Sequence, residues 1–135
     1  MQLPWLSRYQ PQLVAVLRIV TALLFLEHGT QKFFAFPVPF PMPGPLPPLE
    51  IAAGAIELIV GIFVTIGLFT RLFAFLAAGE MAIGYFMFHF PQSFWPAANM
   101  GEAAILYCFV FLYIAAAGPG AWSIDGVREQ KAPPA

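Results

Sequence analysis

The segment LEIAAGAIELIVGIFVTIGLF, residues 49–69, is the plainest indication of fold class in this chain. It is long and apolar enough to cross the roughly 30 Å hydrocarbon core of a bilayer as a helix, which takes about 20 residues. Glu50, Gly54, Glu57 and Gly61 are spaced so that they fall within about 60° of arc on one helical face. Because glycines let a neighbouring helix approach closely, this stripe predicts the face that points into a helical bundle.

Three further apolar segments accompany this one, so that the predicted spans are about residues 13–33, 49–69, 72–90 and 99–117. The chain has 135 residues, 60% of them hydrophobic and 10% charged, which leaves no length for a separate soluble domain. The sequence therefore predicts a single all-α membrane domain over residues 1–135, built as a bundle of four transmembrane helices.

The connections are predicted from proline and from charge. Residues 37–48 read PVPFPMPGPLPP, in which seven of twelve residues are proline, so this segment is predicted as a stiff outer loop. Residues 126–135 are polar and are predicted as a flexible tail. The basic residues Arg8, Arg71, Arg128 and Lys131 fall on one side of the predicted spans and Lys32 on the other. The positive-inside rule then places both termini in the cytoplasm.

Composition narrows the classes of function. The net charge is −1, which offers no basic surface for nucleic acid. Cys108 is the single cysteine, so neither an intrachain disulfide nor a Cys-x-x-Cys thiol relay is available. No residue in the chain can itself carry electrons, and we expect no covalent cofactor.

Ionisable residues inside predicted spans are costly in lipid, and they mark candidate functional sites. Most of them lie toward the outer ends of the spans, and we expect those ends to form one shared polar chamber. The candidates for ligand binding or proton handling are His28, Lys32, Glu57, His89 and Glu102. Arg18 and Glu80 are predicted to form a structural ion pair, with Glu57 or the cytoplasmic surface as alternative partners of Arg18.

Other interpretations of the outer ends stay open at this stage. The two histidines can be hydrogen-bonded interface residues, axial haem ligands, or metal ligands together with Glu27, Glu50 or Glu102. The spacings match no dedicated metal motif, so we predict no metal site. Aromatic residues, among them Phe88, Phe90, Phe94 and Trp95, gather at the same ends. They are typical of an interface belt and also of an apolar wall around a quinone-like ligand.

At these residues the sequence resembles the DoxX family of small bacterial membrane proteins. The matching elements run in order over about residues 18–125, and each is weak alone. They are Arg18, His28-Gly29-x-x-Lys32, Glu57-x-x-x-Gly61, Gly67-Leu68-x-Thr70-Arg71, Met81, His89, Glu102 and Gly118-Pro119-Gly120-x-x-Ser123-x-Asp125. The proline-dense first loop is a departure from the family pattern.

The resemblance implies a multi-pass, four-span bundle in the bacterial inner membrane. The family name derives from a subunit of a quinone-reducing thiosulfate oxidase, and other members are associated with resistance to oxidative stress. Our leading hypothesis is a redox-associated subunit, itself non-catalytic, that binds a quinone-like molecule in an outer-leaflet pocket. Catalysis would then need a partner protein or a bound cofactor, and we expect the chain to associate with a protein partner or with copies of itself. The alternatives are a small oligomeric transporter or pathway for protons or weak acids, and an assembly subunit without a ligand.

Overall fold

The computed structural model describes residues 3–131, and it is helical with no strand over that range. The elements are α1 (Pro4–Ser7), α2 (Gln10–Phe34), α3 (Pro48–Ile66), α4 (Thr70–Gly84), η1 (Tyr85–His89), α5 (Pro96–Asn99), α6 (Glu102–Ala117) and α7 (Ile124–Lys131). The π-helical turn η1 continues α4 without a break. The predicted all-α fold class is confirmed.

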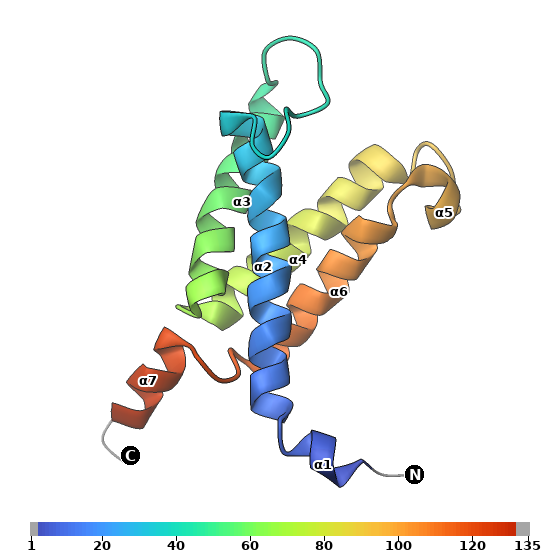
Figure 1. The fold of residues 1–135 in the computed structure, drawn as a ribbon. Coiled ribbons are helices and arrows are strands. Elements are labelled where there is room, and N and C mark those ends of the chain that lie inside the picture. Colours follow the sequence, from blue (N-terminus) through green and yellow to red (C-terminus); the bar gives the residue numbers. More distant parts are fainter. Residues whose placement is uncertain (1–2, 132–135) are drawn as a thin grey trace.

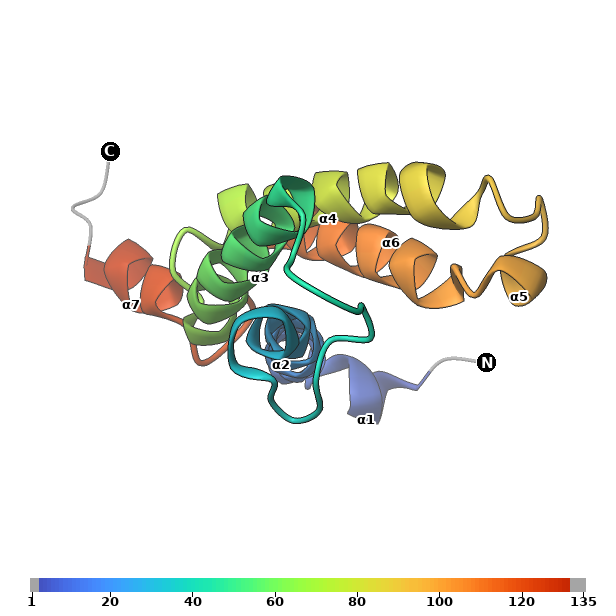
Figure 2. The ribbon, with the colours of Figure 1, turned by 90° about the horizontal axis from the view of Figure 1, so that it is seen from above.

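The long helices form two pairs that diverge. α2 packs along α3 and α4 packs along α6, while α3 and α4 make most of the contact between the pairs. The pairs meet near α7 and separate toward the loops at residues 35–47 and 90–101 (Figures 1 and 2). We call these the terminal end and the loop end. α1 and α7 both lie at the terminal end, which is the arrangement expected when the two termini share one side (Figure 1).

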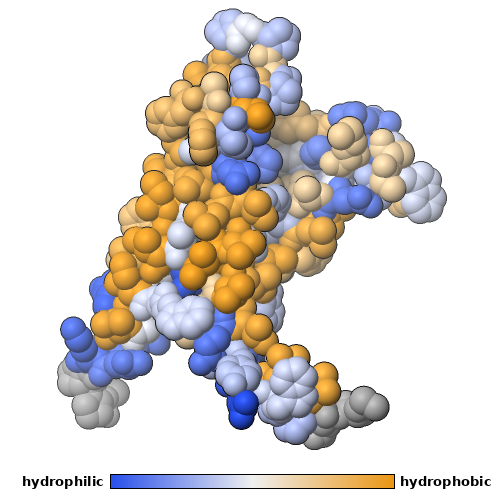
Figure 3. Space-filling model, viewed as in Figure 1, coloured by the Kyte–Doolittle hydropathy of each residue, from blue (hydrophilic) through white to orange (hydrophobic). Residues whose placement is uncertain are grey.

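Within residues 3–131, three helices are long and apolar enough to cross a membrane: α2, α3 and the continuous helix of α4 and η1, Thr70–His89. The fourth apolar helix, α6, is shorter than predicted and begins at Glu102 rather than near residue 99. Residues 96–99 form the separate turn α5, and the left-handed backbone of Met100 divides it from α6. Apolar residues cover the middle of the molecule and polar residues gather toward its ends (Figure 3).

Close approach of α2 and α3 explains the glycine stripe. A Cβ placed on Gly61 would lie 2.9 Å from the Leu26 Cβ, and one on Gly54 would lie 2.9 Å from Cε2 of Phe33. A side chain at Gly61 would therefore separate the two helices, and one at Gly54 would displace the Phe33 ring or the Lys32 stem. The stripe predicted from spacing does face a neighbouring helix, and that neighbour is α2.

Arg18 holds the terminal end together. Its guanidinium is fully buried and donates only to backbone carbonyls of two segments distant in sequence. Those acceptors are Val64 (2.7 Å) and Thr65 in the last turn of α3, and Pro119 (2.8 Å), Ala121 (3.3 Å) and Trp122 (2.8 Å) after α6. We call this set the Arg18 clamp.

The clamp corrects one expectation. Among the described residues Arg18 makes no ion pair with Glu80 or with any other carboxylate. The physical reason is that the last carbonyls of a helix have no intrahelical partner and carry the negative end of its dipole. A planar guanidinium with five donors can satisfy several such carbonyls at once.

Helix α7 forms where a flexible tail was predicted, at least as far as Lys131. Its Asp125 carboxylate accepts hydrogen bonds from the backbone amides of Phe69 (2.9 Å) and Thr70 (2.8 Å), and so caps the start of α4. Burial alone would raise the pKa of Asp125, but hydrogen bonds from Thr70 and Phe69 outweigh it and hold the pKa below its ordinary value. Residues 132–135 of the predicted tail lie outside the described residues.

Replacing Asp125 by alanine should cost about 1 kcal/mol of stability near neutral pH, the usual cost of a lost helix cap. Because folding lowers its pKa, the contribution of Asp125 is present above an unfolded-state pKa of about 4 and is lost as pH falls through the folded value. Thermal unfolding of wild type and variant should thus differ near neutral pH and converge in acid. The control Asp125→Asn keeps an oxygen that can cap the helix but has no carboxyl group to titrate. If Asp125→Ala were less stable than wild type by the same amount near neutral pH and in acid, this account would be contradicted.

Candidate functional site

A cavity of about 820 Å³ lies between the diverging helix pairs. Its walls are mostly apolar, and aromatic side chains contribute to them from α4, η1 and α6: Phe73, Phe75, Phe88 and Tyr107. Phe94, Trp95 and Phe90, by contrast, are exposed and do not line it. The predicted aromatic wall therefore exists in part, built from residues deeper in the helices than most of those at the outer ends.

The cavity also has a polar lining, with members on both helix pairs. His28 and Lys32 come from α2, Glu50 and Glu57 from α3, Glu80 from α4, His89 from η1 and Tyr107 from α6. Of the predicted site residues, His28, Lys32, Glu57 and His89 are thus brought to one cavity. The cavity is thus lined by side chains from α2, α3, α6 and the continuous helix of α4 and η1.

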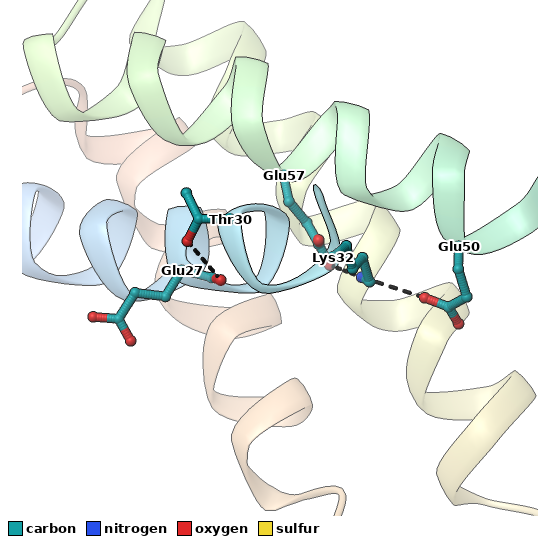
Figure 4. Close-up of polar contacts among 5 residues, drawn as sticks. All are labelled: Glu27, Thr30, Lys32, Glu50 and Glu57. Atoms are coloured by element: carbon teal, nitrogen blue, oxygen red, sulfur yellow. Dashed lines mark hydrogen bonds and ion pairs between the residues drawn. The ribbon is translucent and has the colours of Figure 1, made fainter. Parts of the chain in front are cut away.

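Lys32 lies between two carboxylates of α3 (Figure 4). Its Nζ is 2.6 Å from Oε1 of Glu57 and 3.3 Å from Oε2 of Glu50. All three side chains are nearly inaccessible to solvent, with 6% of Lys32 exposed, 5% of Glu57 and 12% of Glu50. The Phe40 ring of the proline-rich loop lies over the same ammonium, 5.2 Å from Nζ to the ring centroid. We call Lys32, Glu50 and Glu57 the ion triad.

Two cavity glutamates have oxygens without partners. Within residues 3–131, Oε2 of Glu57 and both carboxylate oxygens of Glu80 are buried and accept no hydrogen bond. A buried polar atom without a partner is costly, and it often marks a site that a bound molecule or a mobile proton completes. Glu80, predicted as the partner of Arg18, belongs to this cavity instead.

The histidines of the cavity have different surroundings. Nδ1 of His89 lies 2.9 Å from the carbonyl oxygen of Asn99, which only accepts, so Nδ1 carries the proton and donates it. His28 meets Tyr107 edge to face, with 5.9 Å between ring centroids. In the range 3–131 no group of three or more histidine, cysteine, aspartate or glutamate side chains is arranged to hold a metal ion.

Glu102 is the predicted site residue that the structure does not bring to the cavity. It is exposed at the start of α6, whereas the cavity face of that helix carries Ala103, Ala104 and Tyr107. Glu102 is expected at the cavity because of its depth in the membrane. The rotation of α6 about its axis instead turns Glu102 away from the cavity.

Glu50 and Tyr107, which line the cavity, and Asn99, which lies beside it, are not among the residues predicted for ligand binding or proton handling. A signal for Glu50 was available, because it shares the face of Glu57 on α3. Asn99 is 1% exposed and shapes the loop beside His89, since its Oδ1 accepts from the Gly101 amide at 2.8 Å. No local pattern indicates that role, which depends on the turn between α5 and α6.

Comparison with known proteins agrees with this architecture. A family model described as DoxX matches residues 13–90, a range that contains every lysine, glutamate and histidine of the cavity. A Haemophilus influenzae protein, described as uncharacterized, is 42% identical over 125 residues, covering 89% of this chain and 93% of its own length. No solved structure matches the chain.

Proposed function

The chain belongs to the DoxX family, and from this premise we propose that it is a redox-associated membrane subunit that binds a quinone-like molecule between its helix pairs. The observation that carries the proposal is the cavity of about 820 Å³, apolar along its walls and ionisable at named positions. Its volume lies within the range usual for small-molecule sites, which combine apolar walls with a few polar groups that fix orientation.

In this proposal the apolar walls of the cavity hold the ring and the hydrocarbon tail of the quinone-like ligand, and the polar lining contacts the ligand's oxygens. Glu57, Glu80, His28 and His89 would form hydrogen bonds to the ligand or exchange protons with it. Lys32, one of the candidates for ligand binding, has two carboxylate partners of its own and is better suited to holding Glu57 in place. Electrons would come from a partner protein, because the chain supplies no redox group.

The setting we propose is the inner membrane of a bacterium, with four spans and both termini in the cytoplasm. α6 supports the fourth span by packing along α4, and the shared location of α1 and α7 supports an even number of crossings (Figure 1). The 16 residues of α6 are short for a full crossing; in the proposed setting the turn α5, which precedes α6, would lie at headgroup level.

A transporter is less well supported by the geometry. The cavity lies between pairs that separate toward the loop end, whereas the terminal end is closed by the Arg18 clamp and by a packed core that includes Val64, Ala74 and Ile114. A pathway through one chain would have to cross that core. An assembly subunit without a ligand is the remaining alternative, and the binding test below separates it from the proposal.

Gly84 offers a sharp test of binding. It lines the cavity, and a Cβ placed there meets no atom within 4 Å, so a leucine would project into free space. Gly84→Leu should therefore abolish binding of decylubiquinone or a menaquinone analogue while leaving stability equal or raised, since leucine is also the better helix former. Saturating ligand should raise the thermal stability of the purified wild type, by about 3 kcal/mol at a hundredfold excess over Kd.

The matched control is Glu27→Gln, on the same helix as His28 and Lys32. Glu27 is exposed and points away from the ion triad (Figure 4), so this variant should bind as wild type does. If no quinone analogue stabilises the wild type in detergent or in nanodiscs, or if Gly84→Leu binds normally, the cavity is not a quinone site. If phospholipid raises the thermal stability of the protein and no quinone analogue does, the assembly subunit is the favoured alternative.

A further inference from the structure

The unpartnered polar atoms at the cavity are hydrogen-bond acceptors. Oε2 of Glu57 and both oxygens of Glu80 are buried without a donor among the described residues. Glu57 and Glu80 both line the cavity, so a molecule bound there is placed to supply the missing donors. Nδ1 of His89 donates its proton in the hydrogen bond to the Asn99 carbonyl, so in a neutral His89 ring Nε2 would be a fourth acceptor.

Among the described residues, the one cationic donor of the cavity, Lys32, is in contrast already engaged. The ammonium of Lys32 has three N–H groups, and it faces Glu57 at 2.6 Å, Glu50 at 3.3 Å and the Phe40 ring. The Tyr107 hydroxyl and the His28 ring can each donate or accept a hydrogen bond. A proton on Glu80 would supply one donor and still leave an acceptor on the same carboxyl.

We infer that the cavity selects a ligand that brings its own hydrogen-bond donors, an aromatic diol of the hydroquinone class, over the oxidised quinone. This inference rests on the proposed function and narrows it. A quinone carries carbonyl oxygens, which only accept, and would place them against acceptors. A hydroquinone of the same shape presents two O–H groups that can donate to Glu57, Glu80 or His89.

The discrimination expected is large for so small a chemical change. A binding site rejects an analogue strongly when that analogue leaves a buried polar group of the site unpaired. The polar group then loses its water without gaining a hydrogen-bond partner. The hydrogen bonds in question would be to carboxylates, which are stronger than those between neutral groups. The hydroquinone should therefore bind at least about tenfold more tightly than the quinone.

Three probes of nearly equal shape test the inference: decylubiquinol, decylubiquinone and the dimethyl ether of decylubiquinol. Kd for each is measured by anaerobic titration of the purified full-length protein in nanodiscs, with reductant present for the quinol alone. The quinol should bind most tightly, and the ether, which keeps the oxygens but has no O–H, should lose that advantage. Glu80→Gln exchanges an acceptor for an N–H donor and should shrink the quinol-to-quinone preference severalfold, whereas Glu27→Gln should leave it unchanged.

The outcomes separate the two proposals. Binding of the quinone as tight as that of the quinol, or tighter, overturns the inference and leaves the binding site standing. Binding of none of the three probes overturns the proposed function itself. A quinol preference that Glu80→Gln leaves unaltered overturns the assignment of the donors to this carboxylate.

Discussion

Arg18→Met is expected to prevent the protein from accumulating in the membrane, and Arg18→Lys to lower its stability by about 3 kcal/mol or more. The clamp satisfies five backbone carbonyls with one buried guanidinium. Each carbonyl left buried without a donor costs roughly 1–3 kcal/mol. Lysine keeps the charge, but its compact ammonium cannot reach both the end of α3 and the segment after α6.

The measurement is unfolding of the purified variants by heat or by SDS in mixed micelles, together with yield in the membrane fraction. Arg8→Lys is the control, because Arg8 is exposed and its exchange should change little. Glu80→Gln tests the rival ion-pair hypothesis. If Arg18 depended on Glu80, this variant would be destabilised like Arg18→Lys; the clamp predicts instead that it is as stable as wild type or more so, since an unpartnered carboxylate is removed.

The second large effect is expected at the ion triad. Lys32→Met leaves Glu50 and Glu57 near each other, almost inaccessible to solvent and without their cation. Breaking a buried pair by removing one partner typically costs about 3–5 kcal/mol, because the remaining charge is uncompensated. We expect a loss of that size in the free energy of unfolding.

A double variant separates lost charge balance from lost packing. Lys32→Met combined with Glu57→Gln should recover much of the stability, because one of the two uncompensated carboxylates is gone. Lys131→Met on α7 is the control, since Lys131 is exposed. A single variant as stable as wild type would show that the triad contributes nothing to folding, and failure of the double variant to recover would assign the loss to the lysine stem.

The predictable part of the site followed from spacing along one helix. Glu50, Gly54, Glu57 and Gly61 were placed on one face of α3, and the structure packs the glycines of that face against α2. Periodicity carries this information because it depends only on the fixed rotation per residue.

Partners across helices could not be predicted in the same way. Arg18 was assigned to Glu80, yet it binds carbonyls, which every residue carries and which no sequence pattern singles out. Glu102 was assigned to the cavity by its depth, and the rotation of α6 excluded it. Both errors concern the relative placement of segments rather than the segments themselves.

By itself the sequence determined that this chain forms apolar helices of membrane-spanning length, where they break, and that its few charges lie near one another in depth. Those properties follow from hydropathy, proline placement and helical period, which are local. Only the tertiary structure decided that Lys32 pairs with Glu50 and Glu57, that Arg18 clamps backbone, and that Glu80 is left without a donor at the cavity. The energy of a charge in an apolar interior depends on atoms a few ångströms away, and packing alone brings distant segments to that distance.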